Sequence, residues 1–376
     1  MYVRFLKLRN YRNYNELDLA LQPGINIFLG PNAQGKTNII EAIYYASLGR
    51  SHRTHQDAEL IRWHEEQGSI LLDFDRRGVE NHLEFQFSRN KRRRILLNEH
   101  PIRLKELIGS INSVLFSPED LFLIKGAPAG RRRFLDGEIS QASPPYYHEL
   151  AEFNRIISQR NSLLKRIRER HGDASLLELW DAQLVKSASK IIAKRLEAVR
   201  KLNMLANLMQ RRISSDQENL TVTYEIHGLD EAYGAKDGKS ENMTKSFTSW
   251  YNEMLKQSRE TDILRGSTSY GPHHDDLVLT VNGINLRTFG SQGQQRTGVL
   301  SLKLAELEFL RSETGEYPIL LLDDVMSELD VRRRQQLLAF IRREHIQTLI
   351  TATDAAYFPA EGLGRYYQVK NGRITR

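Results

Sequence analysis

Apolar positions follow two different periods along this chain, one near both ends and another in the middle. Near the amino terminus, short runs rich in β-branched and aromatic residues predict four strands, at residues 2–8, 25–29, 70–74 and 82–87. Between the second and third strands, residues 37–48 carry apolar side chains at helical spacing. Near the carboxyl terminus, the apolar pattern again predicts a strand at 319–322, followed by an Arg- and Gln-rich helix and a strand at 348–351.

The middle of the chain has a helical period instead. After Pro144 and Pro145, an apolar stripe at spacings of three, four or their multiples comprises Leu150, Phe153, Ile157, Leu164 and Ile167. Arg160 interrupts this stripe, and a turn is expected at 171–173. A second stripe comprises Leu184, Ile191, Leu196, Val199, Leu202, Met209 and Ile213. Two antiparallel helices would bury these stripes against each other, and the weakly patterned stretch 233–246 is expected to be a loop.

The three-part pattern allows two domain organisations. Residues 1–143 and 266–376 would form one discontinuous α/β head, and residues 144–265 would form a mainly helical arm inserted into it. The alternative is a row of three consecutive domains. Motifs near the two ends of the chain favour the discontinuous head, as described below.

Composition narrows the class of protein only slightly. The 376 residues carry a net charge of +7, a mild excess that favours an anionic partner only weakly. There is no cysteine, which excludes disulfides, thiolate metal sites and a cysteine nucleophile. The first residues have no apolar segment typical of a signal peptide, and the longest aliphatic run, 319–322, is too short to span a bilayer. We therefore expect a cytoplasmic protein without a membrane partner.

A phosphate-binding loop follows the second predicted strand. It matches G-x-x-x-x-G-K-[ST] at every position, with Gly30, Pro31, Asn32, Ala33, Gln34, Gly35, Lys36 and Thr37. The glycines let backbone N–H groups face phosphates, Lys36 would reach the β- and γ-phosphates, and the Thr37 hydroxyl would bind Mg²⁺. A chance glycine loop is the alternative, and the position between a strand and a helix argues against it. ATP and Mg²⁺ are the expected ligands.

Two carboxylates follow the late apolar strand. Asp323 would hold Mg²⁺ directly or through water, and Asp324 would polarise the attacking water. A buried strand followed by a solvated acidic turn is a common alternative. Combined with the phosphate loop, the pair indicates that both ends of the chain build one sheet. Lys36, Asp323 and Asp324 are therefore the candidate catalytic residues.

Two further polar segments lie between and after these motifs. The loop 289–296 contains Ser291, Gln292, Gly293 and Gln294 and opens a helix, whose start is a potential anion site. After the acidic strand, 327–330 forms a Ser-Glu-Leu-Asp turn at the start of the next helix. Either could be an ordinary helix cap, and Ser327 alone favours that interpretation.

The order of these motifs resembles the ABC-type ATPase head of SMC proteins and of the RecF family, and the short helical insert resembles RecF. Further segments similar to this family lie at 8–14, 49–54, 116–121, 131–136 and 271–276. The resemblance extends from Leu8 to about Asp354, with the arm similar only in character and length. It implies an ATPase head built from both ends of the chain.

The resemblance also implies roles for individual residues. The phosphate loop with the following Asn38, and Arg12 near the amino terminus, would contact the bound nucleotide. Ser291 and its loop would contact the γ-phosphate of ATP held by the opposite subunit of an ATP-dependent homodimer, with Asp330 at the dimer seam. Where a transporter-type head has a histidine after its late strand, this chain has Thr353 and Asp354, and Asp324 replaces a glutamate. We therefore expect weak, DNA-stimulated ATP hydrolysis.

Three basic clusters are candidates for contacts with DNA. Arg50, His52 and Arg53 follow the phosphate-loop helix, and Lys91, Arg92, Arg93 and Arg94 lie in an expected hairpin turn. Residues 131–133 form a third cluster, which is equally suited to hold the head to the arm. A solvated turn, or pairing with nearby acids such as Glu99 and Asp136, is the alternative for each cluster.

The resemblance implies an ATP-gated clamp on double-stranded DNA at single-strand junctions. Such proteins act in recombinational repair and replication-gap processing with RecR and RecO, and help to load RecA. A small-molecule kinase and a scaffold with a structural nucleotide are the alternatives. The kinase would not need the Ser291 loop, and the scaffold would bind DNA equally with and without ATP.

Overall fold

The computed structural model describes residues 1–229, 232–233, 240–359 and 362–375. Contacts divide the chain into two compact units. The first comprises Met1–Asp120 and Glu306–Arg376, and the second comprises Leu121–Ala305. Both ends of the chain thus build one unit. These limits differ from the predicted domain limits, which lie at 143/144 and 265/266. The division into a head and an arm at those two limits stays a prediction.

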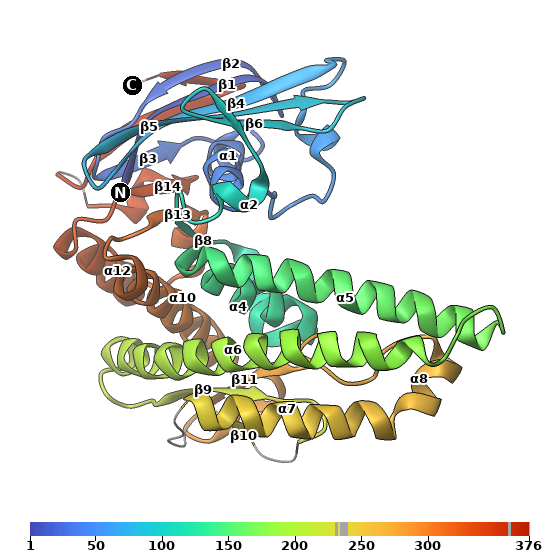
Figure 1. Ribbon diagram of the computed structural model, residues 1–376. Coiled ribbons are helices and arrows are strands. Elements are labelled where there is room, and N and C mark those ends of the chain that lie inside the picture. The colour runs from blue at the N-terminus through green and yellow to red at the C-terminus, as the bar shows by residue number, and fades with distance from the viewer. Residues whose placement is uncertain (230–231, 234–239, 360–361, 376) are drawn as a thin grey trace. The chain divides into compact units, whose positions relative to one another are not determined.

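The first unit contains a mainly parallel sheet (Figure 1). Its order is β16 (Arg373–Thr375), β15 (Arg365–Lys370), β3 (Ile25–Leu29), β14 (Thr348–Ala352), β13 (Ile319–Asp323) and β8 (Ser113–Phe116). Only β16 runs antiparallel to its neighbour. Every residue of β3, β13 and β14 is buried, which explains their continuous apolar character. In such sheets ligands bind beyond the carboxyl ends of the strands.

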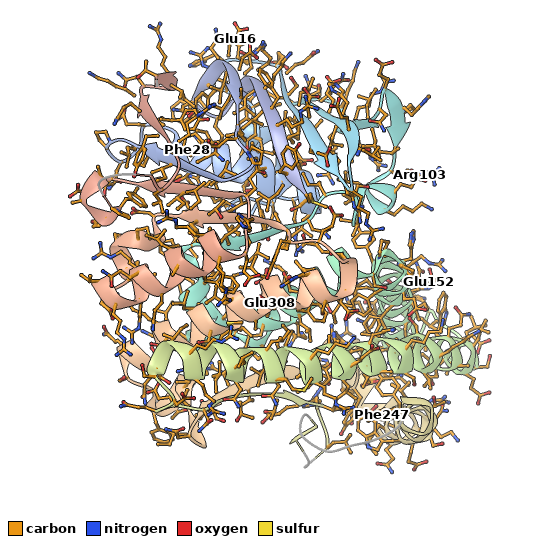
Figure 2. The ribbon with its side chains drawn as sticks, turned by 90° about the vertical axis from the view of Figure 1, so that its left-hand side faces the viewer. Glu16, Phe28, Arg103, Glu152, Phe247 and Glu308 are labelled. Atoms are coloured by element: carbon orange, nitrogen blue, oxygen red, sulfur yellow. The ribbon has the colours of Figure 1, made fainter. Side chains whose placement is uncertain are left out.

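A second sheet of the first unit is antiparallel. Its order is β2 (Tyr14–Ala20), β1 (Tyr2–Tyr11), β4 (Gln67–Arg76), β5 (Val79–Ser88), β6 (Arg94–Leu97) and β7 (His100–Ile102). Helix α1 (Lys36–Leu48) packs on strands of both sheets, namely β4, β8, β13 and β14. In Figure 2, Phe28 lies inside this unit and Glu16 projects from its outer edge. The Phe28 ring stacks on Tyr367 with centroids 4.9 Å apart.

Short helices complete the first unit. They are η1 (Asp57–Leu60), α2 (Leu104–Leu107), α11 (Val325–Glu328), α12 (Val331–Arg343) and η3 (Ala355–Tyr357). The helix predicted at 37–48 and the strands predicted at both ends of the chain fall within observed elements, and α12 is the predicted Arg- and Gln-rich helix. The sequence analysis did not predict β2.

The second unit combines helices with a four-stranded antiparallel sheet. Its longer helices are α4 (Pro128–Ala142), α5 (Pro144–Arg168), α6 (Leu176–Ser214) and α7 (Ser240–Gln257). The sheet order is β10 (Ala232–Tyr233), β9 (Leu220–Glu225), β11 (Asp276–Val281) and β12 (Ile284–Asn285). Shorter helices are η2 (Pro118–Leu121, at the unit limit), α3 (Phe122–Lys125), α8 (Arg259–Arg265) and α9 (Leu286–Phe289). Helix α10 (Gln292–Thr314) begins in this unit and ends in the first.

The predicted helix pair is present as α5 and α6, which pack against each other. Helix α6 also packs on β9 and α7, so it is the central element of this unit. The sequence analysis did not predict β9. The expected loop at 233–246 is wrong for residues 240–246, which belong to α7, while 234–239 lie outside the described residues.

Arg160 does not interrupt the buried face of α5 but belongs to it. The side chain is fully buried, and its guanidinium donates to Asp181 Oδ1 at 2.7 Å, to Asp262 Oδ2 at 2.8 Å and to Thr268 Oγ1 at 2.8 Å. Arg259 donates a further hydrogen bond to Asp181 at 2.9 Å. A buried arginine is tolerated because carboxylates from α6 and α8 compensate its charge.

Candidate nucleotide site

The phosphate loop connects β3 to α1 through a backbone that needs its glycines. Gly30, Ala33 and Gly35 all have positive φ, at 156°, 63° and 110°. A Cβ atom on Gly30 would lie 2.3 Å from the carbonyl oxygen of Val369 on β15. No side chain fits there without a shift of the sheet, so the loop can keep this path only with glycine at position 30.

Residues distant in sequence fix the shape of this loop, and the sequence analysis missed them. Asn13 donates from Nδ2 to the Gln34 carbonyl at 3.1 Å, and the Tyr14 hydroxyl donates to the Gly35 carbonyl at 3.1 Å. The backbone N–H of Asn371 donates to Gln34 Oε1 at 2.7 Å. Asn13 and Tyr14 end the family-like segment 8–14, which was the one available signal for them.

Lys36 folds back over the loop. Its Nζ donates to the carbonyl oxygens of Gly30 at 2.6 Å and Pro31 at 2.7 Å, and the residue is almost fully buried. Burial lowers the pKa of Lys36, while the negative charges of Asp324 and Asp323 raise it and oppose that shift. The positive charge of Lys36 is therefore held against a loop whose backbone is of the kind that binds anions.

Asp323 and two threonines form a hydrogen-bonded group at the carboxyl ends of β13 and β14. Thr37 Oγ1 donates to Asp323 Oδ1 at 2.9 Å, and Thr351 Oγ1 donates to the same oxygen at 2.7 Å. Parallel pairing places Asp323 opposite Thr351. The structure thus brings the predicted metal residues, Thr37 and Asp323, together across 286 positions of sequence. Thr351 is a further member that the sequence analysis did not identify.

Asp324 is held in a strained conformation beside this group. Its φ is 53°, in the left-handed region, and its backbone N–H donates to Thr351 Oγ1 at 2.9 Å. Among the described residues, its buried Oδ1 atom has no hydrogen-bond partner. Burial raises the pKa of Asp324; Lys36 lowers it, and Asp323 and Glu328 raise it further. A buried, unpaired acceptor in a strained residue is typical of a functional position.

The oxygen atoms of this group fit Mg²⁺. A threonine hydroxyl and an aspartate carboxylate are hard ligands of the kind that Mg²⁺ uses together with substrate phosphates and water. The unpaired Oδ1 of Asp324 adds an acceptor at the same place. Within the described part of the chain, no group of three or more His, Asp or Glu side chains is arranged to hold a metal by itself.

Arg12 lies near the loop, but its guanidinium is already engaged. It forms two hydrogen bonds with the carboxylate of the buried Glu41, at 2.9 and 2.6 Å, and a third with the Glu59 carbonyl at 2.9 Å. Burial raises the pKa of Glu41, but the hydrogen bonds from Arg12 and Ser51 outweigh this and leave it lowered. Contact between Arg12 and a nucleotide stays a prediction.

The Ser291 loop lies in the second unit at the start of α10. The Ser291 hydroxyl accepts from the Gln294 backbone N–H at 3.2 Å, and Gln294 Oε1 accepts from the Ser291 N–H at 3.1 Å. This reciprocal cap leaves Ser291, Gln292 and Gly293 exposed. The cap interpretation of this loop is therefore correct as local structure, and the predicted role at a second subunit's phosphate is compatible with it.

Asp330, rather than Ser327, caps α12. Its Oδ1 accepts from the Arg333 N–H at 2.8 Å, and its Oδ2 accepts from the Arg333 side chain at 2.6 Å. Ser327 lies within α11 and donates to the Asp324 carbonyl at 2.7 Å. The cap interpretation of Ser327 is therefore wrong. The role of Asp330 at a dimer seam stays a prediction.

The predicted DNA-binding residues differ widely in their availability. Arg50, Lys91, Arg92 and Arg94 are exposed. Arg53 donates to Asn38 Oδ1 at 2.8 Å and lies 3.4 Å from Glu41. Their roles toward DNA stay predictions.

Two members of these clusters are partly buried, and one of them is engaged in local contacts. Arg93 is half-buried, donates to the Tyr45 hydroxyl and pairs with Asp57 at 3.1 Å. Burial lowers the pKa of His52, and its buried Nδ1 has no hydrogen-bond partner among the described residues. Arg93 and His52 are therefore poorer candidates for phosphate contacts than the exposed residues around them.

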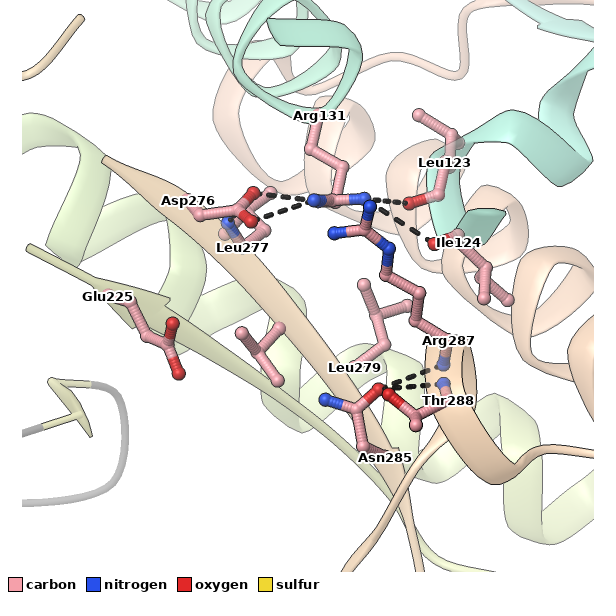
Figure 3. A pocket seen from close by; sticks show the side chains of 11 residues that line it. Leu123, Ile124, Arg131, Glu225, Asp276, Leu277, Leu279, Asn285, Arg287 and Thr288 are labelled. Atoms are coloured by element: carbon pink, nitrogen blue, oxygen red, sulfur yellow. Dashed lines mark hydrogen bonds and ion pairs between the residues drawn. The ribbon is translucent and has the colours of Figure 1, made fainter. Parts of the chain in front are cut away.

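In the cluster at 131–133, Arg131 and Arg132 make contacts within the second unit, whereas Arg133 is exposed. The Arg131 side chain is buried and donates two hydrogen bonds of 2.7 Å to the Asp276 carboxylate, while Arg132 donates to the Asp275 carbonyl at 2.7 Å. Arg131 also lines a pocket of about 330 Å³ into which Arg287 extends (Figure 3). Arg131 thus joins α4 to β11 and is not a free cation.

The comparison with known proteins concerns the whole chain. Residues 2–375 match the family model described as the RecF/RecN/SMC N terminal domain. A "DNA replication and repair protein RecF" from Halothermothrix orenii is 44% identical over 382 residues, which cover 100% of this chain and 99% of that relative. The chain belongs to the RecF family. A relative with the same description from Alkaliphilus oremlandii is 44% identical over 354 residues, covering 94% of this chain and 93% of its own length.

Solved structures agree with the family and define the fold. A structure described as the recombination mediator protein RecF with ATP in the RecFOR pathway has a TM-score of 0.87 at 34% identity, covering 100% of this chain and 97% of its own. An Smc head bound to the C-winged helix domain of ScpA has a TM-score of 0.55 at 13% identity, covering 100% and 96%. The latter shows only that the RecF family shares the SMC-type ATPase head fold. None of the described helices combines the length and apolar character of a membrane span.

Proposed function

We propose that this chain is an ATP-dependent DNA-binding protein of recombinational repair and replication-gap processing. The observation that carries the proposal is the hydrogen-bonded group of Thr37, Asp323 and Thr351 beside Lys36 and the phosphate loop. Its relatives are described as DNA replication and repair proteins, and a similar solved structure is described with ATP.

ATP would bind with its phosphates along the backbone N–H groups of residues 32–37. Lys36 would exchange the two loop carbonyls for phosphate oxygens, a favourable exchange because the new partners carry charge. Thr37 and Asp323 would hold Mg²⁺, which when bound neutralises phosphate charge. Thr351 would keep the Asp323 carboxylate in place through its 2.7 Å hydrogen bond.

Hydrolysis would use Asp324 as the group that orients water. The water oxygen attacks the γ-phosphorus as the bond to the ADP oxygen breaks, and the Asp324 carboxylate accepts the proton. The products are ADP and inorganic phosphate. The unpaired Oδ1 of Asp324 provides the acceptor for this step.

The nucleotide would also join two copies of the chain. The exposed Ser291 loop, with Gln292, Gly293 and Gln294, would contact the γ-phosphate held by the partner subunit, and Asp330 would lie at the seam. The dimer would hold double-stranded DNA near a single-strand junction through exposed cations such as Arg50, Lys91 and Arg92. RecR and RecO are proposed partners, as the description of the similar structure within the RecFOR pathway suggests. RecA is proposed from the family resemblance.

Asp324→Asn is expected to retain ATP affinity and to lose turnover by about 100- to 10,000-fold, since the amide cannot accept the proton. In the wild-type protein, turnover should fall as pH decreases through the pKa of Asp324, which burial places above the ordinary value of 3.8. Phosphate release and nucleotide binding measured across pH test both statements. Unchanged turnover in Asp324→Asn would assign the step to another group.

Ser291→Arg is expected to bind ATP normally, to stay monomeric and to lose turnover by about 100-fold. The reason is that Ser291 would contact the nucleotide held by the partner subunit, not the nucleotide held by its own subunit. Ser175→Arg, an exposed serine just before α6, is the matched control and should behave as wild type. Mass in solution and phosphate release are the measurements. A monomeric Ser291→Arg protein with normal turnover would favour the small-molecule enzyme class.

A further inference from the structure

Trp63 is a large apolar side chain that the fold leaves in solvent. Its side chain is 82% exposed, although it lies between the buried Ile61 and the start of β4. Its chain neighbours, Arg62 and His64, are polar. The exposed indole therefore has no apolar residue next to it in the chain, whereas the core of a protein–protein interface is a contiguous apolar patch.

The turn that carries Trp63 is firmly anchored. The Arg62 N–H donates to the Asn10 carbonyl at 2.8 Å, and the Glu65 N–H closes the turn on the Arg62 carbonyl at 3.1 Å. Arg89, at the start of the β5–β6 connection, donates from Nε to the Glu65 carbonyl at 2.8 Å. The next residue, His64, has a φ of 69°. The indole is thus presented by a fixed backbone, so binding a ligand does not require this turn to become ordered.

The segment beside this turn is cationic, although Arg62 within the turn lies 3.8 Å from Glu65. The hydrogen bond from the Arg89 N–H to the Glu66 carbonyl, at 3.1 Å, places segments 62–66 and 89–92 side by side. Together these segments contain four Arg or Lys residues and two Glu residues. Lys91 and Arg92 are both exposed. An exposed aromatic plane flanked by cations is the combination that binds single-stranded nucleic acid, through base stacking and phosphate contacts.

We infer that Trp63 is a base-stacking site that recognises the junction between double- and single-stranded DNA. This inference rests on the proposed DNA-binding function and adds the residue that would recognise the junction. Base pairs inside a duplex are stacked on both faces, and separating them costs free energy. At a junction, the last pair or the first unpaired base has an open face. The indole stacks there, while Lys91 and Arg92 contact the phosphates of the adjoining strand.

Two circular DNAs of equal length and sequence test this inference. One is covalently closed, and the other carries a single-stranded gap in one strand. With ATP and Mg²⁺, Trp63→Ala should weaken binding to the gapped circle by about 5- to 100-fold and leave binding to the closed circle within about twofold. Trp63→Phe should lose less. Wild-type protein, but not Trp63→Ala, should also change the fluorescence of 2-aminopurine placed as the first unpaired base.

Val79→Ala is the matched control. Val79 is 60% exposed and lies beside the Arg77–Gly78 turn, at the opposite end of the β4–β5 hairpin. Equal weakening of both circles by Trp63→Ala, or undiminished binding to the gapped circle, would overturn the stacking role. Failure of the wild-type protein to bind either circle would instead reject the DNA-binding function on which the inference rests.

Discussion

Lys36→Met is expected to lower ATP turnover by at least about 100-fold and to weaken ATP binding, with the fold retained. The Nζ atom of Lys36 is the cation held inside the phosphate loop, at hydrogen-bond distance from the Gly30 and Pro31 carbonyls. A methionine occupies the same volume but carries no charge to oppose that of the phosphates. Nucleotide titration, phosphate release and circular dichroism measure the three quantities.

Lys105→Met provides the control for Lys36→Met. Lys105 is an exposed lysine of α2 in the same unit, so its replacement should change neither ATP binding nor turnover. If Lys36→Met hydrolysed ATP at the wild-type rate, the phosphate loop would not be the site of turnover, and the proposed roles of Thr37 and Asp323 would lose their basis.

Arg160→Met is expected to destabilise the second unit by about 3–5 kcal/mol. The replacement leaves two carboxylates, Asp181 and Asp262, without the guanidinium that joins them at 2.7 and 2.8 Å. Asp262 is fully buried, so water cannot replace the lost partner without opening the packing of α5 and α8. Urea unfolding followed by circular dichroism and tryptophan fluorescence measures the loss.

A control on the same helix separates burial from charge. Arg155→Met removes an arginine whose pairing with Glu152 is exposed, and should cost no more than about 1 kcal/mol. Adding Asp262→Leu and Asp181→Asn to Arg160→Met should restore much of the stability, since the buried charges are then removed together. Equal stability of Arg160→Met and Arg155→Met would contradict the structural role of the buried network.

The core of the candidate site could be predicted from the sequence because its parts are local. A strand, a glycine loop and a helix are contiguous at residues 25–48, and Asp323 follows directly after a buried strand. Each part has its own pattern, and parallel strands with their carboxyl ends at one edge bring the parts together. The sequence therefore led to Thr37 and Asp323 without any knowledge of their 2.9 Å hydrogen bond.

The remaining features depend on pairings between distant residues, which leave no local pattern. Asn13 and Thr351 support the site from two other elements, and neither has a residue type or spacing that marks it. The charge of Arg160 suggested an interruption of the apolar stripe, but carboxylates 21 and 102 positions away make its burial possible. The sequence made Arg93 a candidate for contact with DNA, but the fold places Tyr45 and Asp57 beside its side chain.

Solution mass and duplex binding, each measured with and without ATP and Mg²⁺, decide whether ATP creates a dimer that binds DNA. We expect a monomer with weak DNA binding in the absence of nucleotide and a DNA-binding dimer in its presence. Lys36→Met should show neither change. A protein that stays monomeric with ATP and binds duplex DNA equally with and without nucleotide would contradict the account.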